Sequence, residues 1–248
     1  MLNPFTTIPA FLKVMGELKT FNRIKPTIDR LHEDGKYEEE RALILQGTSV
    51  FADRISEKLD MSVTIYGEEN TPNQGPVFIV ANHQSYADIY ALFYTIRKFQ
   101  IGFIAKSEFE SFKTLAEAIR NTRSVFIVRG DAREAIELMK TTTEMMKSGF
   151  SLAIFPEGTR SRGGKMAEFK PGSFKFAQKA GVPILPVSLE GGYHLFEEKN
   201  SYQRGTRIKV KVHPLVHYEQ MDRKQQNAAN KEIEETIRQG VKELQEMD

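Results

Sequence analysis

The sequence predicts an α/β fold in which helices cover a mostly parallel sheet, preceded by a helical hairpin. From residue 62 onward, short apolar or alternating segments typical of strands are separated by longer segments with helical periodicity. Residues 1–60 show helical periodicity alone. At 248 residues the chain is long enough for one large α/β domain with an appendage. We therefore expect a hairpin over residues 1–60 and an α/β domain over residues 61–248.

The N-terminal part is expected to be an amphipathic hairpin. Apolar residues recur at helical spacing over 8–21 and again over 43–59, and Pro26 and the Asp34-Gly35 turn signal lie between the two segments. Two interpretations stay open. The apolar stripe packs on the α/β domain, or a basic amphipathic helix that carries phenylalanines lies in a membrane interface.

Strand and helix signals then follow one another in a regular order. The expected strands span residues 62–66, 77–82, 101–105, 124–128, 151–155, 183–189 and 206–212. The expected helices span residues 86–99, 108–121, 131–149 and 173–181, and a last helix runs on from residue 222. Because proline cannot donate a hydrogen bond to a neighbouring strand, Pro183 and Pro186 indicate that their strand lies at an edge of the sheet or holds them at one end.

Composition excludes several kinds of chemistry. The chain has no cysteine, which rules out disulfides, thiolate nucleophiles and cysteine-based zinc or iron–sulfur sites. Its N-terminus lacks the features of a secretory signal, and no window approaches the ~18 consecutive apolar residues of a spanning helix. We expect a protein that is soluble or peripheral to a membrane.

A histidine and an aspartate follow the most apolar of these strands. The buried run at 77–81 stops at Asn82, His83 comes next, and Asp88 follows five residues later. On one continuous helix the two side chains would point roughly 140° apart. They can therefore meet only across a strand-to-helix turn, where a carboxylate can hold an imidazole as a general base. Taken alone, His83 is equally expected as a structural histidine, and an aspartate in the position of Asp88 is most often a helix cap.

Cations follow three other strands. Lys106, Arg129 and Arg160 each come at or just after a strand end, and ligands of open α/β sheets bind beyond the carboxyl ends of strands. Six lysines and arginines accompany two glutamates between residues 156 and 179, which predicts either a solvated surface loop or an anion site. A base and three cations in one cleft suit a hydroxyl on a molecule that carries phosphate.

The sequence does not match the motifs of other common catalytic or phosphate-binding sites. Thr159 and Met166 stand where a phosphate loop ending in G-K-[ST] requires glycine and a hydroxyl residue. There is no G-x-S-x-G elbow for a serine nucleophile. The other histidines lack H-E-x-x-H spacing, and we expect His213 and His217 to be ordinary strand-end residues.

Two segments resemble the signature blocks of the glycerolipid acyltransferases. Residues 82–88, N-H-Q-S-Y-A-D, are similar to the H-x4-D block, and residues 155–161 match F-P-E-G-T-R-S. Residues 182–189 look like the fourth block of the family, and residues 103–108 and 124–129 are similar to the segment between. The resemblance covers about residues 77–192 and is closest to the 1-acylglycerol-3-phosphate acyltransferases.

The resemblance implies an activity and a set of site residues. It implies transfer of a fatty acyl group from acyl-CoA or acyl carrier protein, as co-substrate and without a metal or other cofactor, to the sn-2 hydroxyl of lysophosphatidic acid. The residues it implies are His83 and Asp88 as catalytic pair, and Glu157, Gly158, Thr159, Arg160, Lys106 and Arg129 as substrate-binding residues.

The same resemblance implies a membrane surface as partner, no nucleic acid, and a peripheral location on the cytoplasmic face of the cell membrane. Two alternatives stay open. The acceptor is glycerol-3-phosphate or another lysophospholipid, or the chain is a non-catalytic lipid-binding module that uses its hairpin and basic loop.

Overall fold

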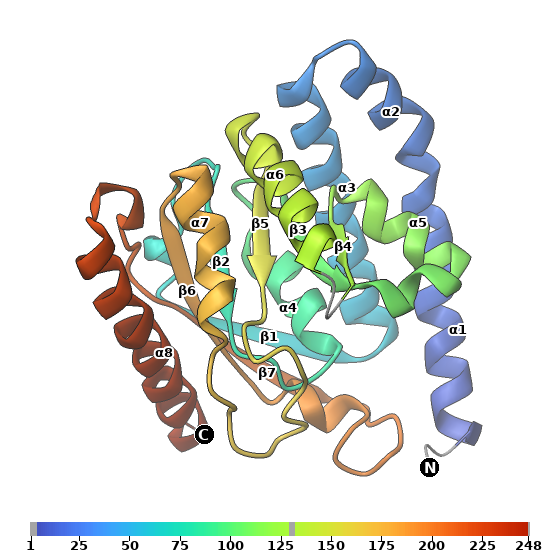
Figure 1. Cartoon of the computed structure of the whole chain (residues 1–248). Coiled ribbons are helices and arrows are strands. Elements are labelled where there is room, and N and C mark those ends of the chain that lie inside the picture. Colours follow the sequence, from blue (N-terminus) through green and yellow to red (C-terminus); the bar gives the residue numbers. More distant parts are fainter. Residues whose placement is uncertain (1–3, 129–131, 248) are drawn as a thin grey trace.

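The computed structural model describes residues 4–128 and 132–247, in which helices and strands alternate in the expected order (Figure 1). The strands are β1 (Met61–Tyr66), β2 (Phe78–Ala81), β3 (Ile101–Lys106), β4 (Val125–Ile127), β5 (Ser151–Ile154), β6 (Ile184–Glu190) and β7 (Thr206–Val212). The helices are α1 (Pro4–Phe21), α2 (Lys25–Glu33), α3 (Tyr37–Lys58), α4 (Ala87–Thr95), α5 (Lys113–Asn121), α6 (Ala132–Lys147), α7 (Lys175–Ala180) and α8 (Arg223–Glu246).

Within the described residues, the strands form one seven-stranded sheet in the order β1-β7-β6-β2-β5-β3-β4. Every neighbouring pair is parallel except β6 and β7, which are antiparallel. The predicted fold class, a mostly parallel sheet covered by helices, is therefore confirmed.

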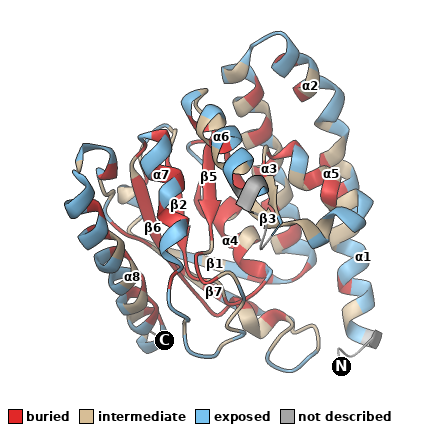
Figure 2. Cartoon of the chain, in the orientation of Figure 1, coloured by how far each residue is buried: buried red, intermediate tan, exposed pale blue. Residues whose placement is uncertain are grey.

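The central strand β2 separates two buried layers. Its successive side chains point to opposite faces of the sheet, and all four residues are buried. Ile79 and Ala81 join a core that includes residues of α3 and α4, whereas Phe78 and Val80 join a core that includes residues of α6, α7 and α8. Figure 2 shows the buried residues concentrated on these central strands. The carboxyl ends of β2, β5 and β3 consequently share one rim between two helical layers.

The N-terminal helices form the expected hairpin and pack on the α/β part. A 3-10 turn at Asn22–Ile24 joins α1 to α2, and the chain reverses at Gly35, whose φ of +68° suits glycine. Leu18 and Phe21 of α1 cluster with Ala118 of α5. The Phe51 ring of α3 also lies edge-on to a phenylalanine of α4, at 6.5 Å between centroids. Leu18 and Phe21, in the apolar stripe of the first helix, therefore pack on the α/β part of the protein.

The expectation that the prolines of the strand at 183–189 mark a sheet edge or a strand end holds only in part. Pro183 directly precedes β6, but β6 lies in the interior of the sheet and Pro186 falls within it. The antiparallel ladder with β7 begins at Val187, and an isolated bridge precedes it at Ile184. Pro186 falls between the two, where its carbonyl accepts the N–H of His213 at 3.0 Å. In a full antiparallel ladder two opposed residues would exchange two hydrogen bonds, and Pro186 makes only the one that its carbonyl accepts, so the ladder ends at this point.

Two helices are shorter than their periodicity suggests. The segment expected as one helix over 108–121 is a 3-10 turn at Ser107–Ser111 followed by α5, with Phe112 in a non-helical conformation between them. The Ser111 hydroxyl donates to the Glu108 carbonyl and so competes with helical hydrogen bonding. Helix α4 ends at Thr95 because Ile96 is extended, and burial of that side chain in the core outweighs its helical spacing.

Candidate active site

A buried asparagine fixes the turn that follows β2. The Asn82 side chain donates to the Leu189 carbonyl at 2.9 Å and accepts the Leu189 N–H at 2.7 Å. It thereby continues the pairing of β2 with β6 one residue beyond the ladder, which ends at Ala81. His83 leaves the sheet from this clamped position, so its backbone is fixed before the chain enters α4.

His83 and Asp88 meet across the strand-to-helix turn, as their spacing predicts. Nδ1 of His83 lies 2.8 Å from Oδ2 of Asp88, and the histidine side chain is 14% exposed while the carboxylate is fully buried. The same oxygen accepts the backbone N–H groups of Gln84 at 2.6 Å and Ser85 at 2.9 Å. The backbone of the turn therefore fixes the Asp88 carboxylate, and the carboxylate in turn orients the His83 ring.

This contact determines how the imidazole is protonated. An ionised carboxylate accepts hydrogen bonds only, so Nδ1 of His83 carries the proton and donates it to Asp88. Nε2 then holds a lone pair, and it makes no hydrogen bond to any residue within the described parts of the chain. A neutral histidine oriented in this way can accept a proton at Nε2.

The second block lies directly against this turn. The Phe155 ring stacks on the His83 imidazole, with centroids 4.0 Å apart and planes 13° from parallel. The N–H of Ser161 donates to the His83 carbonyl at 2.8 Å, and the N–H of Arg162 donates to the Gln84 carbonyl at 3.1 Å. The two signature blocks, about 70 residues apart in the sequence, thus contact each other at the His83 turn.

Glu157 braces the loop from within. Its Oε1 accepts the His83 N–H at 2.6 Å and its Oε2 accepts the Ala167 N–H at 2.8 Å, and the residue is 4% exposed. Burial raises the pKa of Glu157, and the two backbone N–H groups oppose that rise. Both oxygens are thus occupied, and the carboxylate ties the beginning and the end of the basic loop to the histidine.

Arg160 lies beside the same turn and is already paired. Its guanidinium carbon lies 3.6 Å from the centroid of the Tyr86 ring, and Nη1 lies 2.7 Å from Oε1 of Glu197. The arginine side chain is 19% exposed. The structure therefore brings Arg160, Glu157 and the histidine–aspartate pair together.

Three of the other expected site residues are described by the structure. Gly158 has a φ of +69°, which suits glycine at this turn. Thr159 is exposed, and Lys106 is half-buried at the end of β3. Neither side chain makes a hydrogen bond or ion pair with a described residue. Arg129 lies outside the residues that the structure describes.

Comparison with known protein families identifies the family that carries the two blocks. The sequence model of the family described as Acyltransferase matches residues 62–190, which hold both blocks. This chain belongs to the acyltransferase family. The resemblance of the two blocks is thereby confirmed.

Relatives and a solved structure extend the match. A 1-acyl-sn-glycerol-3-phosphate acyltransferase of Chlamydomonas reinhardtii is 39% identical over 62% of this chain, which spans only 46% of that protein. A probable enzyme of the same name from Mycoplasma pneumoniae is 32% identical over 72% of each chain. The crystal structure of the 1-acyl-sn-glycerophosphate (LPA) acyltransferase PlsC from Thermotoga maritima is 27% identical, with a TM-score of 0.72 over 97% of this chain and 99% of that one.

The candidate site contains polar residues that the sequence pattern did not single out. Gln84 donates to Glu190 at 2.6 Å and accepts the Gly191 N–H at 3.1 Å. Gln84 could have been found from the sequence, because it is a polar residue inside the block at 82–88. Glu197 gives no such signal, because it meets Arg160 across 37 residues of loop and strand.

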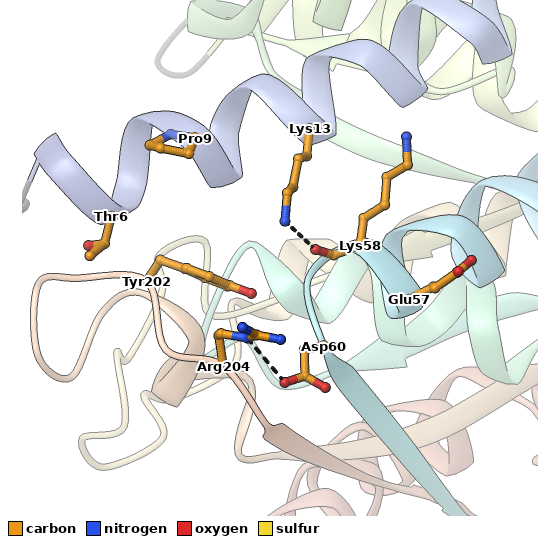
Figure 3. A pocket seen from close by; sticks show the side chains of 8 residues that line it. All are labelled: Thr6, Pro9, Lys13, Glu57, Lys58, Asp60, Tyr202 and Arg204. Carbon is orange, nitrogen blue, oxygen red and sulfur yellow. Dashed lines mark hydrogen bonds and ion pairs between the residues drawn. The ribbon is translucent and has the colours of Figure 1, made fainter.

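A crevice of roughly 630 Å³ lies away from this site, between α1 and the loop before β7 (Figure 3). Lys13 donates to the Lys58 carbonyl at 2.8 Å, and Arg204 lies 3.4 Å from Asp60. No residue of either signature block lines this crevice, so it adds nothing to the acyltransferase site. Nor do the described residues include a group of three or more histidine and acidic side chains that could hold a metal ion.

Proposed function

We propose that this protein transfers a fatty acyl group from an acyl thioester to the sn-2 hydroxyl of lysophosphatidic acid and so makes phosphatidic acid. The observation that carries the proposal is the 2.8 Å contact between His83 and Asp88. Backbone hydrogen bonds tie the turn that holds this pair to the loop that bears Arg160. The names of the relatives support the same acceptor. Acyl-CoA and acyl carrier protein are both suitable donors.

His83 supplies the base. Its Nε2 accepts the proton of the acceptor hydroxyl while the oxygen attacks the thioester carbonyl. Asp88 keeps the proton on Nδ1 and stabilises the imidazolium that forms. When the tetrahedral intermediate collapses, the carbon–sulfur bond breaks and His83 returns the proton to the thiolate. A thioester is already activated, so the acyl group passes directly to the acceptor without an acyl-enzyme.

Arg160 binds the phosphate of the acceptor. Its guanidinium presents N–H donors in a plane that matches phosphate oxygens, and it stays charged at any physiological pH. Lys106, at the end of β3, and Arg129 contribute further positive charge to phosphate binding, as the sequence suggests. Glu157, Gly158 and Thr159 shape the loop and orient the glycerol, and Glu157 does so through its two backbone hydrogen bonds.

The protein binds the membrane surface peripherally, and residues 1–60 serve as the anchor of an acyltransferase domain that spans residues 61–248. None of the helices in residues 4–128 and 132–247 is long and apolar enough to cross a bilayer. On α1, however, Ile8, Phe11 and Leu12 are 55%, 54% and 63% exposed at helical spacing. An apolar face of this kind suits a membrane interface, here the cytoplasmic face of the cell membrane.

An acyl-transfer assay with a panel of acceptors and donors tests the proposal. Purified protein receives lysophosphatidic acid, glycerol-3-phosphate or another lysophospholipid, each with acyl-CoA or with acyl carrier protein, and free thiol and lipid product are measured. Thiol release that depends on lysophosphatidic acid, with phosphatidic acid as product, is the expected result. Release with a different acceptor alone would replace the acceptor, and no release with any pair would favour a non-catalytic lipid-binding module.

A further inference from the structure

Glu197 is a buried carboxylate beside the site to which the two signature blocks give no role. It lies in the loop between β6 and β7, two residues after the 3-10 turn Gly192–Leu195, and its side chain is 7% exposed. Oε1 accepts a hydrogen bond from Nη1 of Arg160 at 2.7 Å, and Oε2 accepts one from the Ser85 hydroxyl at 2.9 Å. Each carboxylate oxygen therefore has a partner.

These two partners belong to the two signature blocks. Ser85 is fully buried, and its N–H donates to the carboxylate of Asp88 at 2.9 Å. Arg160 carries the charge proposed above for the acceptor phosphate. Glu197 thus links the cation to the turn that holds the histidine, through Ser85 and with one hydrogen bond at each step.

The Arg160 guanidinium is held on two sides, and its other N–H groups have no partner among the described residues. Tyr86 covers one face of Arg160 at 3.6 Å, and Glu197 holds its Nη1 end. A guanidinium has five N–H donors, and those on Nε and Nη2 make no hydrogen bond to the described residues. Because a free arginine side chain samples many rotamers, fixing one end before the ligand arrives lowers the entropy lost on binding.

The backbone around Glu197 is anchored on both sides. Its N–H donates to the Tyr193 carbonyl at 3.0 Å, and the N–H of Gln203 donates to the Leu195 carbonyl at 2.9 Å. The Leu195 side chain is 2% exposed and belongs to the main core. The carboxylate is therefore a fixed point and not a mobile surface group.

On the basis of the function proposed above, we propose that Glu197 is a positioning residue for Arg160. It fixes the guanidinium relative to the His83–Asp88 pair, so that a phosphate bound by the open N–H groups brings the acceptor hydroxyl to Nε2 of His83. Glu197 itself does not touch the acceptor. The opposite role, a carboxylate that fills the phosphate position and must leave, would cost two hydrogen bonds of a buried group at every turnover.

Kinetics of matched variants test this role. E197A, E197Q and the control E198A are compared with wild type for kcat and KM toward lysophosphatidic acid at saturating donor, together with thermal unfolding. Glu198 is the next residue, and it is 44% exposed and pairs only with His194 among the described residues. We expect E197A to lower kcat/KM about 10-fold or more, mostly through KM, and E198A to leave it unchanged.

Two further comparisons separate positioning from a structural role. An amide at 197 can still accept from Arg160 and can donate to the Ser85 hydroxyl, so E197Q should recover most of the loss seen in E197A. In an R160A background, E197A should have no further effect on kcat/KM, because Glu197 acts through the arginine. A lower KM in both E197A and E197Q would instead show a carboxylate that competes with the phosphate. Kinetics equal to those of E198A, with a lower melting temperature alone, would also overturn the proposal.

A binding experiment keeps this result separate from the proposed function. Wild type and the same variants are titrated with a short-chain lysophosphatidic acid, without donor, and ligand-dependent thermal stabilisation is followed. If wild type binds this lipid but transfers nothing to it, the proposed function fails, and weaker binding by E197A still supports the role of Glu197. If wild type transfers and binds while E197A binds equally well, the role of Glu197 alone is wrong. No binding by wild type would overturn both.

Discussion

Gly192 lies so close to Asp88 that a β-carbon at this position would stand 2.7 Å from Oδ1 of the carboxylate. That oxygen is buried and makes no hydrogen bond to a described residue, while Oδ2 accepts three. The missing side chain at 192 therefore lets the loop after β6 close over the start of α4 without displacing the Asp88 carboxylate.

Gly192→Ala should disturb catalysis more than folding. A methyl group at 2.7 Å must push the carboxylate or the loop, and a displacement of about 1 Å at a reacting group can cost roughly 100-fold in rate. We expect kcat to fall roughly 10- to 100-fold while the protein still unfolds cooperatively. Gly172→Ala is the matched control, because a β-carbon there has no atom within 4 Å. Equal activity of the two variants would show that the contact has no role.

His83→Ala should remove the general base. In the proposed mechanism the imidazole takes the proton of the acceptor hydroxyl, and general-base assistance of this kind is worth ~10²–10⁴ in rate. The measurement is kcat for thiol release with lysophosphatidic acid, with circular dichroism to check the fold. His217→Ala is the control, since that side chain is 59% exposed and lies away from the site. Turnover of His83→Ala within a few-fold of wild type would disprove the mechanism.

Arg160→Ala should weaken binding of the acceptor. A charge-assisted hydrogen bond is worth ~1.5–3 kcal/mol, so loss of the arginine should raise the KM for lysophosphatidic acid roughly 10- to 100-fold. The KM for the thioester donor should stay near its wild-type value. Arg223→Ala, which removes an exposed arginine at the start of α8, controls for the change in net charge. If both variants keep the acceptor KM of wild type, Arg160 does not bind the phosphate.

The sequence predicted the parts of the site that are local. His83 and Asp88 are five residues apart, so the strand signal before them and the helix signal after them sufficed to place the turn. The rule that ligands bind beyond the carboxyl ends of parallel strands pointed to Arg160, which the structure does bring to the histidine turn, while no described contact joins Lys106 to them. Pairings over long separations could not be read in this way. Glu197 reaches Ser85 across 112 residues, and that contact depends on how the loop after β6 folds back.

Tertiary burial decided the other differences. The helical pattern over 86–99 counted Ile96 as part of a helix, but the side chain is 1% exposed in a core that an extended residue reaches better. Pro186 looked like an edge residue because a sequence does not reveal that the pairing with β7 is interrupted at that point. Propensity and periodicity describe one segment at a time, whereas both outcomes depend on a second segment.

The exposed face of α1 should carry membrane binding. Ile8, Phe11 and Leu12 project from a helix whose inner face is packed, and each apolar side chain that enters a bilayer contributes ~1.5–3 kcal/mol. Replacing the three with glutamine should weaken flotation with anionic liposomes roughly 100-fold or more. Val50→Gln is the control, since Val50 is a 43% exposed apolar residue of α3. Flotation of the triple variant equal to that of the control would refute this anchor.

His213 should make stability depend on pH below neutrality. The residue is 6% exposed, and Nε2 lies 2.8 Å from the Ser188 hydroxyl, which itself donates to the Ile237 carbonyl at 2.9 Å. The hydroxyl proton is thus in use, so Nε2 of His213 donates to the Ser188 oxygen. Burial first, and then the nearby Lys211, lower the pKa of His213 from 6.5 to about 4, against a smaller opposite effect of Glu243.

The sign of the effect follows from proton uptake. Between pH 6.5 and about 4 the unfolded chain binds a proton at His213 that the folded protein excludes, so the free energy of unfolding falls as pH falls through this window. At ~1.4 kcal/mol per pKa unit, the loss between pH 7.5 and pH 5 is about 2 kcal/mol. His213→Gln should abolish this part of the slope in urea unfolding measured at both pH values, whatever its own stability. His217→Gln, at an exposed site, should keep it, and identical slopes for His213→Gln and wild type would show that His213 titrates normally in the folded state.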